Sequence, residues 1–156
     1  MSARRRSSAM LSGACLCGAV RYEIDGGPRF MYRCYCEKCR AASGAPFANN
    51  LIVDSARFHI GAGQRALAAF ESSPGKHRYF CSRCGSPIYS HGEKTRHYVS
   101  VRCGTLKEDP DLRVAYHAFV ASKAPWVEIS DGQPQFAEWP DPAFTKALWE
   151  SASKQP

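Results

Sequence analysis

The chain has 156 residues and a formal net charge of +7, with 44% hydrophobic and 22% charged residues. This length suits a single domain with a sizeable core, and the composition excludes a disordered chain. No apolar run approaches the roughly 20 residues that a membrane-spanning helix needs, so we expect no membrane partner. The unusual feature of the composition is its eight cysteines.

Seven of the eight cysteines fall into three tight clusters, and Cys103 stands apart from them. The first residues are basic but lack the apolar stretch of a secretory signal, which predicts a cytoplasmic protein. In a reducing compartment, clustered cysteines are metal ligands or redox centres more often than structural disulfides. The clusters are Cys15 with Cys17, then Cys34, Cys36 and Cys39, and finally Cys81 with Cys84.

The positive charge begins with Arg4, Arg5 and Arg6 in a stretch rich in serine and alanine. Basic surfaces attract nucleic-acid phosphates, but three arginines near a terminus are more simply a solvated tail. An anionic small molecule suits the remaining basic residues as well as a nucleic acid does. We therefore predict a disordered arm over residues 1–12 and do not expect nucleic acid as the main partner.

Short runs of β-branched and aromatic residues, separated by turn residues, extend from residue 13 to about residue 129. In the first run Val20, Tyr22 and Ile24 alternate with polar residues, which indicates a half-buried strand. So many short strands favour a mainly β fold of antiparallel sheets over parallel βαβ units. The other predicted strands cover residues 29–34, 47–53, 57–60, 66–71, 77–81, 88–90, 98–103, 113–120 and 126–129.

Two short segments have helical composition. Residues 37–42 follow the first cysteines of the middle cluster, and residues 142–153 contain several good helix formers. The sequence thus divides into the arm, a main domain over residues 13–140 and a small helical tail over residues 141–156.

The outer two cysteine clusters supply four thiolates in a CxC and a CxxC motif, each followed by a glycine. Zinc in structural sites takes four such ligands at tetrahedral corners, commonly from two short loops. Gly18 and Gly85 suit the tight turns that aim backbone N–H groups at the sulfurs. We therefore predict a closed zinc site formed by Cys15, Cys17, Cys81 and Cys84.

The middle cluster, Cys34, Cys36 and Cys39, supplies three ligands and leaves one zinc position open. Catalytic zinc sites have three protein ligands and one exchangeable position, whereas structural sites are closed. Alternatively, Cys103 or a histidine completes the site and makes it a second structural centre. A redox function fits less well, because a thioredoxin-type CxxC sits in a βαβ context and leaves Cys34 unexplained.

These cysteine motifs and their flanks resemble the glutathione-dependent formaldehyde-activating enzymes, which share an Mss4-like zinc-binding β fold with centromere protein V. The resemblance covers roughly residues 13–139. Two departures from the family pattern lie near the motifs: Tyr35 stands where the family often has histidine, and Lys107 follows the Gly-Thr-Leu motif where acidic residues are common. The matching stretches are GACLCGAV at 13–20, CYCEKCR at 34–40, ASGAPF at 42–47, FCSRCGSP at 80–87, GTL at 104–106, HAFV at 117–120 and APW at 124–126.

The resemblance implies two zinc ions per chain, a structural one at the outer clusters and a catalytic one at Cys34, Cys36 and Cys39. It implies addition of the glutathione thiol to formaldehyde, which is a carbon–sulfur lyase reaction in reverse. The implied partners are therefore glutathione or a similar thiol and a small aldehyde. A non-enzymatic zinc module that contacts nucleic acid or protein remains the alternative.

Glutathione carries two carboxylates, so its site should offer arginine or lysine donors. Ser43 and Gly44 can donate hydrogen bonds to a substrate, and His117 can act as an acid or base, although packing within a strand is its simpler role. The basic residues closest to the clusters in the sequence are Arg33, Lys38, Arg40, Arg78 and Arg102.

Overall fold

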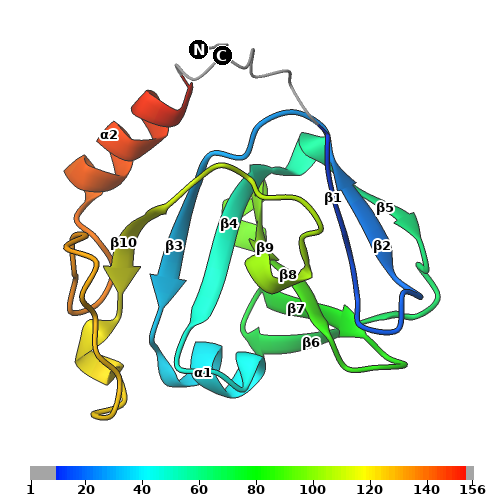
Figure 1. Ribbon diagram of the computed structural model, residues 1–156, viewed down its shortest axis with the longest axis horizontal. Coiled ribbons are helices and arrows are strands. Elements are labelled where there is room, and N and C mark those ends of the chain that lie inside the picture. Colours follow the sequence, from blue (N-terminus) through cyan, green and yellow to red (C-terminus); the bar gives the residue numbers. More distant parts are fainter. Residues whose placement is uncertain (1–9, 154–156) are drawn as a thin grey trace, which may run out of the picture.

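The structure is a computed structural model that describes residues 10–153 (Figure 1). Most of the predicted N-terminal arm, residues 1–9, lies outside the described residues. Strand β1 begins at Leu11, so the last residues of the range predicted as an arm are ordered in a sheet. Between residues 10 and 153, every helix is too short or too polar to cross a lipid bilayer.

The described chain is mainly β, as predicted, with a short helix after the third strand and a longer one at its end. The strands are β1 (Leu11–Ala14), β2 (Arg21–Ile24), β3 (Phe30–Cys34), β4 (Ala48–Asp54), β5 (Phe58–Ala62), β6 (Leu67–Ser73), β7 (Lys76–Cys81), β8 (Pro87–Gly92), β9 (Tyr98–Arg102) and β10 (Val114–Ala118). The α-helices are α1 (Glu37–Ser43) and α2 (Pro142–Ser153).

The strands form two sheets. Strands β1, β2 and β5 make a three-stranded antiparallel sheet, and the larger sheet has the order β10-β3-β4-β9-β8-β7-β6. All neighbours in the larger sheet are antiparallel except β10, which pairs with β3 in parallel. The pairing of β10 with β3 is the exception to the predicted antiparallel sheets, because β10 returns to β3 from across the sheet after a long stretch of chain.

The main core lies between the two sheets. Tyr22 and Ile24 of β2 pack in one cluster with Leu51 of β4 and with Val99 and Val101 of β9. All five side chains are buried, which is the burial that the alternation around Tyr22 predicts for one face of a strand.

A second core lies on the opposite face of the larger sheet, where α2 covers the β3 and β10 edge (Figure 1). Phe30 and Tyr116 of the sheet pack with Leu148 and Trp149 of the helix. Asp141 caps the helix by accepting a hydrogen bond from the N–H of Phe144 at 2.8 Å. The C-terminal segment is therefore part of the folded body.

The predicted and observed strands differ at two segments. Residues 126–129 form no strand, because the N–H of Val127 donates to the carbonyl of Ala124 and closes a turn that contains Pro125 and Trp126. Conversely, β1 was not predicted, since its small residues carry little strand signal.

The alternation of β9 builds the floor of a cavity. Val99 and Val101 face the core between the sheets, so Tyr98, Ser100 and Arg102 face the opposite side. The same face continues onto β3, β4, β7 and β8, where alternate residues line the same cavity. Polar side chains on this face are thus held by a rigid sheet.

Candidate active site and metal centres

The outer cysteines converge into one group. The sulfurs of Cys15, Cys17, Cys81 and Cys84 all lie within 4.8 Å of one another, with 3.6 Å between Cys15 and Cys17 and 3.8 Å between Cys17 and Cys81. Sulfurs at the corners of a zinc tetrahedron with bonds of about 2.3 Å are about 3.8 Å apart. All four are free thiols, so the donor set fits a closed tetrahedral metal site.

Both loops of this group have the turn that the glycines predict. Gly18 and Gly85 each adopt a φ of 77°, a conformation that side chains disfavour. The N–H of Gly18 donates to the carbonyl of Cys15 at 3.0 Å, and that of Gly85 to Cys81 at 2.8 Å. The N–H of Val20 points at the Cys15 sulfur at 3.2 Å, a contact that stabilises a thiolate.

The middle cysteines form a second group, with their three sulfurs within 4.8 Å of one another. Cys34 ends β3, Cys36 is the N-cap of α1, and Cys39 lies in the first turn of that helix. The Cys36 sulfur accepts a hydrogen bond from the N–H of Cys39 at 3.4 Å, and Gly44 ends the helix in the left-handed conformation. The end of the strand and the start of the helix together fix the positions of the three sulfurs.

Cys103 does not join this group. It packs beside the core between the sheets, whereas Cys34 and Cys39 belong to the core on the opposite face. Within residues 10–153, no Cys, His, Asp or Glu joins the three sulfurs as a fourth ligand. The alternative in which Cys103 closes the site is therefore wrong, and a metal ion held here keeps a free coordination position.

Tyr35 anchors the loop between Cys34 and Cys36. Its hydroxyl lies 2.9 Å from Nδ1 of His117, and Nε2 of His117 lies 2.9 Å from the Asp131 carboxylate. The hydrogen bond from His117 lowers the pKa of Asp131. Because His117 is 0% exposed and both ring nitrogens are engaged, it holds the loop in place and is not an acid or base facing substrate.

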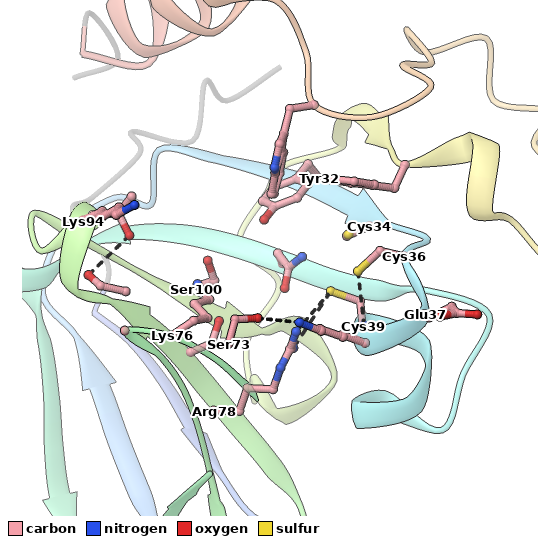
Figure 2. Close-up of a pocket in the computed structure, with 18 of the residues that line it drawn as sticks. Tyr32, Cys34, Cys36, Glu37, Cys39, Ser73, Lys76, Arg78, Lys94 and Ser100 are labelled. Carbon is pink, nitrogen blue, oxygen red and sulfur yellow. Dashed lines mark hydrogen bonds between the residues drawn. The ribbon is translucent and has the colours of Figure 1, made fainter. Parts of the chain in front are cut away.

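The middle cysteines open into a cavity of about 710 Å³ (Figure 2). Figure 2 shows Tyr32 on one side of the three sulfurs and Ser73, Lys76 and Arg78 on the other. This volume is in the range of sites for small organic ligands. Glu37 and Glu93 are the acidic residues of the lining, which also contains six cationic side chains, Lys38, Arg40, Lys76, Arg78, Lys94 and Arg102.

Three of these cations are packed together on the floor. Arg102 is 8% exposed and donates a short hydrogen bond to the amide oxygen of Asn50. Burial and, next, the charges of Arg102 and Arg78 lower the pKa of Lys76 to about 8. Within residues 10–153, no carboxylate forms an ion pair with any of the three. Clustered positive charge without a carboxylate partner favours an anionic ligand.

Arg78 also links the floor to the sulfurs. Its two terminal nitrogens lie 3.9 and 3.8 Å from the Cys39 sulfur. The side-chain hydrogen bond between Cys34 and Cys39, aided by the Arg78 charge, lowers the pKa of the Cys39 thiol to about 5. The same hydrogen bond raises the pKa of the Cys34 thiol. The group therefore favours a thiolate even before a metal ion adds its charge.

The structure divides the predicted substrate-binding residues. Lys38, Arg40, Arg78 and Arg102 line the cavity, but Arg33 instead stacks over the Phe47 ring at 4.4 Å. Ser43 caps α1 by donating to the carbonyl of Cys39, and Gly44 lines a separate shallow groove. Two further cations of the lining, Lys76 and Lys94, were not predicted from the sequence, although polar alternation in β7 and β9 signals a lined face. The aromatic part of the lining was not predicted either; it consists of Tyr32, Tyr98, Phe119 and Trp139.

Comparisons with known proteins show the family of this chain. A family model described as "Glutathione-dependent formaldehyde-activating enzyme" matches residues 10–122. A Halomonas elongata protein named "Putative glutathione-dependent formaldehyde-activating enzyme" is 32% identical over 149 residues, covering 88% of this chain and 93% of that protein. The crystal structure of a Rhodobacter sphaeroides protein has the same fold, with a TM-score of 0.55 at 22% identity, over 63% of this chain and 89% of that one. The chain therefore belongs to the family of glutathione-dependent formaldehyde-activating enzymes.

Proposed function

We propose that this protein is a zinc-dependent enzyme that forms and cleaves the carbon–sulfur bond between glutathione and formaldehyde. Cys15, Cys17, Cys81 and Cys84 hold a structural zinc, and Cys34, Cys36 and Cys39 hold the catalytic one. The observation that carries the proposal is a single cavity in which three cysteine sulfurs with a free fourth position adjoin the buried Arg102 and two further cations, none of them ion-paired to a carboxylate among residues 10–153. Family membership supports the choice of thiol and aldehyde.

Charge complementarity favours a thiol that carries carboxylates. Arg102 and Lys76 bind these carboxylates on the floor, and the Asn50 amide holds the Arg102 guanidinium in place. At the mouth, Lys38 Nζ donates to the Ser73 hydroxyl at 2.7 Å and so bridges α1 and β6 (Figure 2). A ligand fixed between these walls presents its sulfur to Cys34, Cys36 and Cys39 with little motional freedom, which contributes to the rate of a two-reactant step.

Zinc bound by three cysteines lowers the pKa of a thiol that enters its fourth position. In the reaction, a sulfur lone pair forms the bond to the aldehyde carbon, and the electron pair of the C=O π bond moves to the oxygen. The oxygen takes up one proton and the thiol loses one, so the addition balances without another reactant. Arg78, beside Cys39, adds positive charge that favours thiolate over thiol.

Exchange kinetics test the proposal, because uncatalysed addition obscures a net-formation assay. At equilibrium, NMR exchange spectroscopy measures how fast ¹³C-formaldehyde enters and leaves S-hydroxymethylglutathione. We expect the zinc-loaded protein to accelerate exchange at least about tenfold over buffer, since positioned reactants and an activated thiol each contribute that much or more.

The matched control is Cys36→Ala, which removes one ligand of the middle group and leaves the four outer cysteines intact. Its exchange rate should equal that of buffer. Equal rates for wild type and buffer, with both metal sites occupied, would refute the proposed activity.

Lys76 should make ligand affinity dependent on pH. Its pKa of about 8 means that the amine is charged below that pH and loses its charge above it. A bound carboxylate stabilises the charged form, so affinity should be constant below pH 8 and fall as the pH rises beyond it. We expect S-methylglutathione, which has no ionisable thiol, to bind about tenfold more weakly at pH 9.5 than at pH 7 by calorimetry.

Lys76→Arg is the control, because a guanidinium stays charged over this range. In the Lys76→Arg variant, ligand affinity should fall much less as the pH rises above 8. This result would separate the effect of Lys76 from ionisation of the ligand amine. The same decline in both proteins would show that Lys76 does not contact the anion.

A further inference from the structure

Besides its cations, the cavity has aromatic side chains in its lining. Tyr32, Tyr98, Phe119 and Trp139 all line it, and Cys34 and Cys36 lie in the same lining. Formaldehyde consists of one CH2 group and one oxygen, so it has almost no apolar surface that aromatic rings could cover. The cationic and the aromatic side chains of the lining therefore suit different parts of one ligand.

These aromatic side chains are fixed in place. The rings of Phe119 and Trp139 meet edge to face at 5.0 Å, and Trp139 lies tilted against Tyr32 at 6.1 Å. Tyr32 in turn stacks on Tyr116 at 4.9 Å in the core below. Trp139 nonetheless remains 59% exposed, so a large apolar surface beside the sulfurs is left uncovered.

The backbone of Phe119 is strained. It adopts φ 59° and ψ 39°, the left-handed region that a bulky side chain rarely occupies. Hydrogen bonds impose this conformation: the Phe119 N–H donates to the Glu138 carbonyl at 2.9 Å, and the Phe119 carbonyl accepts from Ser122 at 3.0 Å. Strained backbone conformations are more frequent at ligand-binding sites, where they orient a side chain in a direction that a regular helix or strand does not allow.

We propose that the cavity accepts glutathione conjugates in which the sulfur carries a planar apolar group, so that the aldehyde partner of the enzyme includes aromatic aldehydes. This inference rests on the proposed function, since it uses the same thiol and the same sulfurs. Arg102 and Lys76 hold the carboxylates, and Phe119 and Trp139 cover the ring. The bond changes are those given for formaldehyde, with an aryl group in place of one hydrogen on the aldehyde carbon.

Binding to the zinc-loaded protein tests this inference with three probes: glutathione, S-methylglutathione and S-benzylglutathione. The two thioethers share a blocked sulfur and differ only in the ring. We expect the benzyl conjugate to bind on the order of tenfold more tightly than the methyl conjugate, because the ring buries apolar surface. Phe119→Ala and Trp139→Ala should each remove most of this preference and leave the affinity for glutathione unchanged.

Trp126→Ala is the matched control, because Trp126 is 73% exposed and lines a separate groove. It should keep the full preference for the benzyl conjugate. Equal or weaker binding of the benzyl conjugate, with glutathione bound, would overturn the aromatic subsite and leave the proposed function standing. Failure of all three probes to bind would overturn both.

Discussion

Cys81→Ala should unfold the protein, whereas Cys36→Ala should leave it folded and inactive. The Cys81 sulfur is buried between the two sheets and belongs to the group that joins the loop after β1 to the end of β7. Structural zinc sites contribute about 10–16 kcal/mol in isolated peptides, which equals or exceeds the total stability of a typical domain. Loss of one ligand from this group therefore removes the fold.

Native mass spectrometry and circular dichroism check this contrast. We expect two zinc ions in the wild type, one in Cys36→Ala, and a collapsed β signal with a shortfall of metal in Cys81→Ala. Cys103→Ala is the control, since Cys103 belongs to neither group of sulfurs. It should keep both ions. A folded Cys81→Ala protein, or loss of zinc from Cys103→Ala, would contradict the assignment of the two centres.

Arg102→Met should reduce glutathione affinity by about a hundredfold without lowering the thermal midpoint. Truncating one partner of a buried charge pair typically weakens binding by this amount or more. The free protein, however, keeps Arg102 buried beside Lys76 and Arg78. Removing one of three neighbouring positive charges relieves repulsion, which offsets the lost hydrogen bond to Asn50.

Arg29→Met should have the opposite effects on thermal stability and on glutathione affinity. Arg29 lies outside the cavity lining and makes two hydrogen bonds to the Asp54 carboxylate, at 3.0 and 2.7 Å. Its replacement should lower the thermal midpoint and leave glutathione affinity unchanged. Calorimetric titration and thermal unfolding of both variants measure the two effects. A lower midpoint together with full affinity in Arg102→Met would make Arg102 a structural residue only.

The sequence allowed the two groups of cysteines to be predicted because the spacing of metal-binding motifs is local. Short spacings place Cys34, Cys36 and Cys39 together whatever the rest of the chain does, and paired CxC and CxxC motifs have few uses besides a shared metal. The position of Cys103 depended on the fold alone. Adjacent to Arg102 in the chain, it nevertheless packs against the other core.

The residues that line the cavity were harder to predict, because their positions depend on the fold and not on local spacing in the sequence. Whether Lys76 faces the cavity depends on the pairing register of β7 with its neighbours, and a shift by one residue reverses the face. Phe119 and Trp139 meet only because the segment at 134–138 returns alongside the end of β10. Sheet order, and the parallel pairing of β10 with β3, arise from packing that no local pattern encodes.

The two cysteine groups enclose very different lengths of chain. We expect this difference to decide which group comes together first as the protein folds. Cys34 to Cys39 span a few residues, so they can capture an ion while the chain is still extended. Cys17 and Cys81 are 64 residues apart, and they meet only after the intervening strands have paired. We therefore expect the middle group to be able to bind an ion earlier in synthesis than the outer group, whose cysteines meet only in a sheet that has already formed.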